Sequence, residues 1–169
     1  AMVPVPETAR CAGKGAGQRG VRRHNGVLAA VALACATTTG VWAQAPPAST
    51  QLPTGGQVVQ GAASISQSST AQASSMVVNQ SSARAVVDWS SFTVGANAQV
   101  RFHHPNAQSA TLNRVNDANP SQIFGRIESN GQVILSNANG VYFSPSSRMD
   151  MGALTATTHS IDAQAFMAG

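Results

Sequence analysis

The chain has 169 residues, enough for one domain with a modest hydrophobic core, and a formal net charge of +4. All of this excess charge lies in residues 1–43, because residues 44–169 carry five arginines against five acidic side chains, and this excludes a basic nucleic-acid interface after residue 43. Both cysteines, Cys11 and Cys35, also lie in residues 1–43, so the later part must be stabilised by a core and backbone hydrogen bonds rather than by disulfides.

Residues 1–43 have the pattern of a signal peptide. A basic stretch precedes an apolar run over residues 26–36, which has the length of a signal-peptide core and is too short to span a bilayer as a helix. Cleavage is possible after Ala43 or after Ala45, and we favour Ala43 because Pro46 would follow the second site. The basic stretch begins late in the chain, which indicates either an extended signal peptide or an upstream start site. The pattern implies the Sec machinery and signal peptidase as export partners.

Residues 44–57 are rich in proline and glycine and are predicted to form a connector. From residue 58 the chain is a series of short apolar or alternating runs separated by small polar residues, which is typical of β-strands. The strands predicted from this pattern are 58–59, 62–65, 76–78, 85–89, 92–94, 98–102, 110–115, 123–127, 133–135, 141–143, 149–151 and 154–157. Residues 119–124 are the one helix candidate, and we assign them to a loop or a single turn because Gly125 follows at once.

Two Asn-Gly pairs stand immediately before two of the most apolar runs. Asn130–Gly131 precedes residues 133–135, and Asn139–Gly140 precedes residues 141–143. Both residue types tolerate the positive φ of tight turns, so each pair predicts a turn between strands.

Many short strands with short turns fit a sandwich, a propeller or a parallel β-solenoid. Three features favour the solenoid. Asparagine recurs at the breaks, where amides can stack between coils; charged residues are rare in the strands; and small residues punctuate the chain at intervals that fit coils of roughly 20 residues. The expected fold class is therefore all-β, a right-handed parallel β-helix preceded by a signal peptide.

Residues 87–169 resemble the N-terminal two-partner-secretion domain, also called the haemagglutination activity domain, of filamentous-haemagglutinin-like exoproteins. Five blocks carry the resemblance in order: Asp88-Trp89-Ser90-Ser91-Phe92-Thr93-Val94-Gly95, Val100-Arg101-Phe102 through Leu112-Asn113-Arg114-Val115, Pro120-Ser121-Gln122-Ile123-Phe124-Gly125, Asn130-Gly131-Gln132-Val133-Ile134-Leu135, and Asn137-Ala138-Asn139-Gly140-Val141-Tyr142-Phe143. One position departs from the family pattern, since Ala138 stands where the family usually has proline.

The resemblance implies a transport role rather than an enzymatic one. Residues 58–169 would be the N-terminal part of a β-helix with more coils than this chain supplies. The domain would reach the periplasm, engage the periplasmic domains of an outer-membrane β-barrel transporter, and fold at the cell surface or in the medium. The full-length protein would be an adhesin or a contact-dependent toxin, with host-cell or glycan contacts made by later regions. No cofactor and no nucleic-acid partner is expected.

Two blocks are the candidate sites for transporter recognition or for nucleation of the first coils. They comprise Leu112, Asn113, Arg114 and Val115, and Asn137, Ala138, Asn139, Gly140 and Val141. Both blocks can equally be turn and core of the β-helix. Trp89, Phe92, Gly95 and Phe102 are expected to be structural. For Arg114 we expect a stem that covers apolar surface and a head group that bonds turn carbonyls.

The residues give less support to a metal site or to a catalytic acid pair. His103 and His104 are adjacent, and neighbouring strand residues point to opposite faces, so the pair is not expected to chelate one metal ion. Glu128 and Asp150 could lie one coil apart on the same face, as the acid pairs of β-helical polysaccharide-cleaving enzymes do. A stand-alone carbohydrate-active enzyme is thus the alternative function, but solvated surface charges with nearby arginines are the simpler interpretation.

Overall fold

The computed structural model describes residues 45–169 and contains, within them, ten strands and one short helix. The predicted signal peptide and both cysteines lie outside the described residues. The strands are β1 (Gln57–Gln60), β2 (Ala63–Ser69), β3 (Ser74–Gln80), β4 (Arg84–Trp89), β5 (Ala98–His103), β6 (Ala110–Val115), β7 (Ser121–Ile123), β8 (Arg126–Asn137), β9 (Val141–Phe143) and β10 (Arg148–Thr157), and the helix is α1 (Ala163–Ala168). No helix in this described part is long and apolar enough to cross a membrane.

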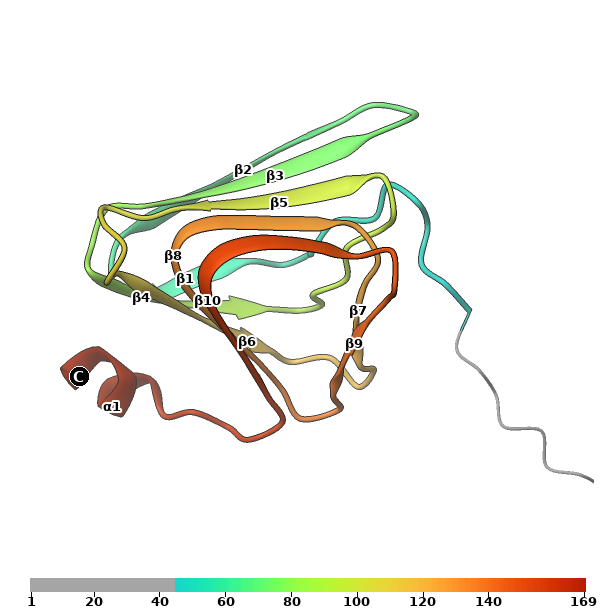
Figure 1. Cartoon of the computed structure of the whole chain (residues 1–169). Coiled ribbons are helices and arrows are strands. Elements are labelled where there is room, and N and C mark those ends of the chain that lie inside the picture. Colours follow the sequence, from blue (N-terminus) through green and yellow to red (C-terminus); the bar gives the residue numbers. More distant parts are fainter. Residues whose placement is uncertain (1–44) are drawn as a thin grey trace, which may run out of the picture. The chain divides into compact units, whose positions relative to one another are not determined.

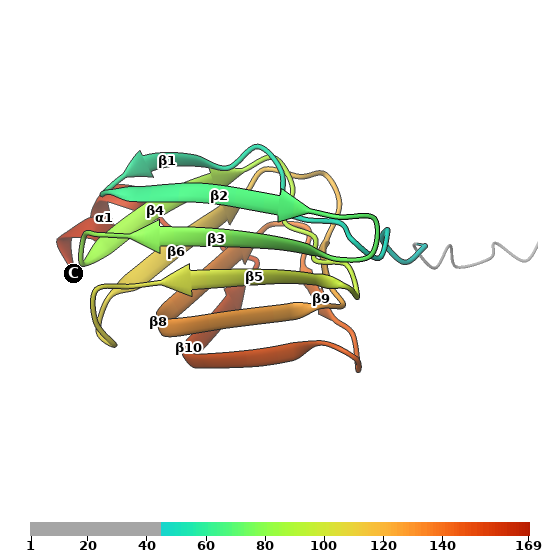
Figure 2. The same ribbon diagram turned by 90° about the horizontal axis from the view of Figure 1, so that it is seen from above.

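The strands wind into a right-handed parallel β-helix of about four turns, which confirms the predicted fold class. Strands β3, β5, β8 and β10 pair in parallel along one face, and β4, β6, β8 and β10 pair in parallel along a second. Strands β7 and β9 form a short third face. Figures 1 and 2 show the coils stacked in sequence order, with β3 near one end and β10 at the other.

The coils are longer and less regular than the predicted 20 residues. Ser75, Gln99, Arg126 and Arg148 occupy one ladder of paired positions, so successive coils contain 24, 27 and 22 residues. The additional residues lie in the loops between faces, whose length the strand pattern does not determine. Because each strand still alternates between an inward and an outward side chain, the register is kept despite the unequal coils.

The N-terminal strands differ from the predicted all-parallel ladder. Strand β1 runs antiparallel to β4, and β2 runs antiparallel to β3 as a hairpin. The first coil of a parallel ladder would otherwise leave a row of backbone donors and acceptors unpaired. The two antiparallel strands satisfy that edge and close this end of the β-helix.

The predicted connector is also part of the folded unit. The amide of Gly95 donates to the carbonyl of Gln51 at 2.9 Å, and the amide of Asn97 donates to the carbonyl of Ser49 at 2.7 Å. Thr54 forms a bridge with Ser91. These bonds attach residues 49–54 to the loop between β4 and β5, so this segment is hydrogen-bonded structure and not a free linker.

The Asn130–Gly131 turn prediction is wrong, because β8 runs through it. Residues 126–129 of β8 pair with β5, and residues 132–137 pair with β6, so the Asn-Gly pair is a corner within one strand. A Cβ on Gly131 would lie 2.7 Å from His104 Cγ and from the Ser109 carbonyl oxygen. This glycine is therefore required by the close approach of the previous coil. The Asn139 turn, in contrast, does separate β8 from β9.

The core fills the interior between the three faces. Its fully buried large side chains include Trp89, Phe92, Phe102, Ile123 and Leu135, whereas Leu112 is buried outside this interior, beneath α1. The segment predicted as a loop or single turn at residues 119–124 contains the strand β7, which pairs in parallel with β9.

Helix α1 was not predicted. It begins after Asp162, whose carboxylate accepts a hydrogen bond from the amide of Ala165. It packs Ala163, Phe166 and Met167 over the outer surface of β4 and β6.

Candidate functional site

The two candidate blocks lie side by side on consecutive coils. Parallel pairing of β6 with β8 sets Arg114 opposite Ser136 and Val115 opposite Asn137. The loop after Val115 and the turn after Asn137 therefore leave the β-helix at the same corner. We call this corner, made of residues 112–121 and 136–141, the β6–β8 corner.

Asn137 joins the two turns of the corner from inside. Its side-chain amide donates to the carbonyl of Asn119 at 3.1 Å and to the hydroxyl of Ser121 at 3.0 Å. Its side-chain oxygen accepts a hydrogen bond from the amide of Asn139 at 2.9 Å. All three bonds are local or reach the coil before, so Asn137 fixes the turn 138–140 to the loop that precedes β7.

Asn139 and Gly140, in the second half of the turn, form further hydrogen bonds at this corner. The amide of Gly140 donates to the carbonyl of Asn137 at 2.9 Å, and Gly140 has a φ of +98°, which favours glycine. The side chain of Asn139 donates to the carbonyl of Asp117 at 2.6 Å. Asparagine thus bonds backbone carbonyls of the neighbouring coil at this corner, whereas the sequence analysis expected amides to stack on one another.

Burial divides the nine candidate residues into two groups. Leu112, Asn113 and Asn137 are at most 1% exposed, and Val115 is 7% exposed. The candidate residues that reach the surface are Arg114, Ala138, Asn139, Gly140 and Val141. The buried group assembles the corner, and a folded partner could contact only the second group.

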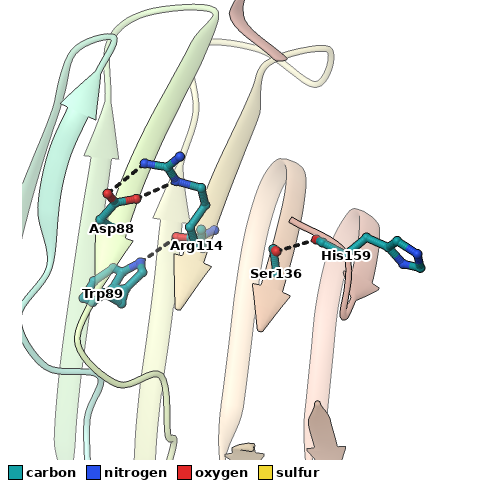
Figure 3. Close-up of polar contacts among 6 residues, drawn as sticks. Asp88, Trp89, Arg114, Ser136 and His159 are labelled. Carbon is teal, nitrogen blue, oxygen red and sulfur yellow. Dashed lines mark hydrogen bonds and ion pairs between the residues drawn. The ribbon is translucent and has the colours of Figure 1, made fainter. Parts of the chain in front are cut away.

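A surface pocket of about 240 Å³ lies against the exposed group. Its lining residues come from β6 and the loop after it, from the end of β8, and from the segment before α1: Arg114, Val115, Asn116, Ser136, Ala138, Thr158 and Ser160. The hydroxyl of Ser136 donates to the carbonyl of His159 at 2.8 Å, which holds the wall formed by residues 158–160 against β8 (Figure 3). The pocket has a polar rim and one cationic group.

Arg114 has a different partner from the one expected. Its guanidinium donates to both carboxylate oxygens of Asp88 at 2.7 and 2.8 Å, across the outer surface of β4 and β6 (Figure 3). The hydrogen bond that Arg114 donates to Asp88 raises the pKa of Arg114. The expectation of turn carbonyls is wrong because Asp88 is the register partner of Arg114 on the preceding coil and offers the two oxygens that a guanidinium binds best.

Asn113 is the residue whose role the sequence analysis missed. Its side-chain oxygen accepts a hydrogen bond from the indole N–H of Trp89 at 3.0 Å, and its amide donates to the carbonyl of Ile134 at 3.2 Å. Trp89 also packs edge-on against Phe92, with ring centroids 5.4 Å apart. A buried indole needs a partner for its N–H, so the polar residue inside the Leu-Asn-Arg-Val block was the available signal.

The other residues expected to be structural lie in the interior. Phe102 is 1% exposed. A Cβ on Gly95 would lie 2.2 Å from the carbonyl oxygen of Ala48 and 2.5 Å from that of Ser49. Gly95 is therefore the position at which the N-terminal segment crosses the first loop.

The structure also places the histidine pair and the acid pair considered from the sequence. His103 is exposed and His104 is 6% exposed, as expected for neighbours on opposite faces. Among the residues that the structure describes, no group of three or more His, Cys, Asp or Glu side chains could hold a metal ion. Asp150 pairs in register with Glu128, which confirms the predicted stacking. Glu128 binds Arg101 and Arg126 at 2.7 Å each, and the hydrogen bond from Arg101 lowers its pKa.

The fold is a parallel β-helix whose first coil is closed by antiparallel strands and whose coils are joined by side-chain amides at the β6–β8 corner. The family model described as the TPS secretion domain, for two-partner secretion, matches residues 49–169, and the chain belongs to this family. Its members are secretion domains of exoproteins, not enzymes, and they leave the cell through the outer membrane with a partner transporter.

Individual relatives agree with the family assignment. The chain is 37% identical over 111 residues to the heme/hemopexin-binding protein of Haemophilus influenzae strain Rd, and 38% identical over 90 residues to another protein of that name from H. influenzae. These alignments cover 66% and 53% of this chain but only 12% and 10% of those proteins. The crystal structure of the HMW1 secretion domain from H. influenzae superposes with a TM-score of 0.62 at 30% identity, covering 69% of this chain and 30% of that one.

Proposed function

We propose that the exposed part of the β6–β8 corner is the surface by which the partner outer-membrane transporter recognises this domain. The observation that supports this most is the division of the corner by burial. Arg114 and Ala138 line one surface pocket and Asn139, next to Ala138, is exposed, while the buried Asn137 holds the turn in place. The corner is thus a hydrogen-bonded turn that presents exposed amides, Asn139 among them, beside the ion-paired Arg114.

The proposal also describes how the chain is exported. Residues 1–43 direct it to the Sec machinery and are removed by signal peptidase. The periplasmic domains of the transporter then bind the corner, and the chain passes to the cell surface or the medium. Stacking of each new coil on the last supplies free energy for outward movement without a nucleotide. Exposed strand edges are also available for pairing with the transporter before folding is complete.

The activity of the whole exoprotein lies outside this domain. The chain spans 12% of the heme/hemopexin-binding relative, and we infer that its own full-length protein is an adhesin, a contact-dependent toxin or a ligand-binding exoprotein of that general kind. Contacts with host cells or glycans would be made by the regions that follow.

The alternative of a stand-alone carbohydrate-active enzyme is not favoured by its best candidate pair. Acid catalysis at a glycosidic bond needs one carboxyl group whose pKa is raised so that it carries a proton. Glu128 has the opposite environment, because Arg101 and Arg126 both bind its carboxylate and its pKa is lowered. A surface ion-pair cluster accounts for these residues.

A secretion assay of corner variants tests the proposal. Asn139→Ala removes an exposed amide of the turn, and we expect it to reduce transporter-dependent secretion while leaving the folded domain intact by circular dichroism. Asn106→Ala is the matched control, since Asn106 is also exposed and also caps a turn, through bonds to Gln108 and Ser109 at a different corner. Equal secretion of the two variants would contradict recognition at the β6–β8 corner.

A further inference from the structure

His104 is buried at the corner that follows β5, and the transport function gives it no role. The side chain is 6% exposed although histidine is titratable near neutral pH. Both ring nitrogens have a hydroxyl partner: Nε2 lies 2.8 Å from Thr111 Oγ1 and Nδ1 lies 3.1 Å from Ser129 Oγ. The direction of each of these hydrogen bonds can be worked out from the groups around them.

The chain of hydrogen bonds starts at Gln80, at the end of β3. Its amide nitrogen donates to the carbonyls of Ser82 at 2.7 Å and Ala110 at 3.3 Å. Both donors are therefore used, and the amide oxygen faces Thr111. The hydroxyl of Thr111 donates to this oxygen at 2.5 Å.

The hydrogen bonds of Thr111 and Ser129 then determine which ring nitrogen of His104 carries a proton. The single hydroxyl proton of Thr111 is committed to Gln80, so Thr111 accepts from Nε2–H of His104. In the neutral ring Nδ1 has no proton and accepts from the hydroxyl of Ser129. Ser129 Oγ in turn accepts from the amide of Gly131 at 3.1 Å. Every donor has an acceptor, and the pattern is that of a neutral histidine.

The backbone around His104 is held equally closely. Its amide donates to the side-chain oxygen of Asn130 at 2.7 Å, and its carbonyl accepts from the Asn130 amide at 2.8 Å. The ring stacks on Phe102 with centroids 6.3 Å apart. On another side Gly131 approaches so closely that a Cβ would lie 2.8 Å from Nδ1. The ring has little room to turn away.

A second proton on the ring would disturb this arrangement. Nδ1–H would point at Ser129 Oγ, whose own proton would have to leave its acceptor, and a positive charge would be enclosed without a carboxylate beside it. The groups facing the ring from the packed elements are neutral, namely Gln80 of β3, Thr111 of β6, and Ser129, Asn130 and Gly131 of β8. Burial is the largest influence and lowers the pKa of His104; the hydrogen bond with Asn130 opposes it, the nearby His103 adds to it, and the net direction is downward.

We propose that Gln80, His104, Thr111 and residues 129–131, which we call the His104 corner, form a pH-sensitive clamp. The clamp joins three successive coils when the histidine is neutral and loosens when mild acid protonates it. It shares no residue with the β6–β8 corner and does not depend on how the transporter recognises the domain. Through it, the docking of successive coils responds to the pH of the surroundings in which the chain folds.

The sign of the effect follows from linkage. The unfolded chain takes up a proton on this histidine at its ordinary pKa of about 6.5, whereas the folded state resists it. The contribution of His104 to stability is therefore complete above about pH 6.5 and declines as the pH falls below it. Over that window the equilibrium constant for unfolding should rise by up to about tenfold per pH unit.

The test is denaturant unfolding of the full chain between pH 7.5 and pH 5.5, with two matched variants. His104→Gln places a neutral amide at the corner and should flatten the pH dependence. His103→Gln removes the exposed neighbour and should retain the dependence of the unchanged protein. The proposal is overturned if His104→Gln keeps the full dependence or if His103→Gln abolishes it.

An NMR titration covers the case in which His104→Gln does not fold. In the unchanged protein the imidazole resonances of His104 should stay in the neutral position well below pH 6.5, and amide exchange of His104 and Gln132 should accelerate in acid after correction for the intrinsic rate. Titration of His104 at the same pH as an exposed histidine would refute the clamp.

Discussion

The indole of Trp89 and the side-chain amide of Asn113 are joined by a 3.0 Å hydrogen bond in the interior of the β-helix, where each is at most 1% exposed. Asn113 continues this contact to the carbonyl of Ile134 on the following coil. A single polar side chain thus connects three consecutive coils inside an apolar core. The bond sets the rotation of the indole, which in turn packs on Phe92.

Replacing Asn113 with alanine should be strongly destabilising. The change leaves the Trp89 N–H without a partner and a small cavity beside it, and we expect a loss of about 2–4 kcal/mol in the free energy of unfolding. Denaturant unfolding followed by tryptophan fluorescence measures this. Asn79→Ala, at an exposed strand position, is the control and should change stability by less than about 0.5 kcal/mol; similar losses in the two variants would contradict the role of Asn113.

The turn at residues 137–140 should accept the proline that the family usually has at position 138. The amide of Gly140 donates to the carbonyl of Asn137, so Ala138 is the second residue of the turn. No residue other than glycine has a positive φ in the described part of the chain, which indicates a type I turn. Ala138→Pro should stabilise the domain by about 0.4–1 kcal/mol, because it reduces the freedom of the unfolded chain.

Thermal unfolding of Ala138→Pro beside the unchanged protein measures this. Ala107→Pro is the matched comparison: the amide of Ser109 donates to the carbonyl of Asn106 at 3.2 Å, so Ala107 is also the second residue of a turn and should also accept proline. A decrease in the melting temperature of Ala138→Pro would show that the turn does not have the conformation described.

The Arg114–Asp88 ion pair should contribute little to stability despite its two short bonds. The side chains are 31% and 25% exposed, so water screens the attraction. A double-mutant cycle with Arg114→Ala and Asp88→Ala should give a coupling of about 0.5–1 kcal/mol that decreases as salt is added. A coupling that salt leaves unchanged would mean that the pair is more buried than described.

Gly125 should be intolerant of even a methyl group. A Cβ at this position would lie 2.2 Å from the carbonyl oxygens of both Ala98 and Gly95, which belong to the coil before. Gly125→Ala should therefore separate these two coils and cost about 2–3 kcal/mol. Gly152→Ala is the matched control, since its nearest neighbour would be 3.3 Å away and the residue is exposed. Equal stability of the two variants would be inconsistent with the stacking of Gly125 on Gly95.

The repeating features of the fold were predictable from local pattern. Alternation of small or apolar with polar residues located β6 at residues 110–115 with the bounds that the structure has. Likewise, the order of the five family blocks identified the β-helix. These signals are local in sequence, because a strand with one buried face requires a period of two.

The features that were missed depend on contacts between coils. Nothing near Arg114 in sequence indicates Asp88, which becomes its partner only through the register of β4 and β6. An Asn-Gly pair marks a change of direction, but residues 130–131 show that a corner within one strand gives the same signal as a turn between two. Helix α1 had a capping signal in Asp162, yet its short length offered little periodicity to detect.

The same limit applies to the candidate site. The two blocks were predicted as residues of interest, and the structure adds that only part of each reaches the surface. Asn137 and Asn139 look alike in sequence. Their environments separate them, since one is buried within the corner and the other is exposed on it.

Transporter-dependent secretion tests the central claim most directly. The chain is expressed in a Gram-negative host with and without its partner outer-membrane transporter, and the periplasm and medium are assayed for it. The account predicts that the chain appears in the medium or at the cell surface only when the transporter is present, and remains in the periplasm otherwise. Release that is equal in the two hosts, or retention in the periplasm of both, would contradict it.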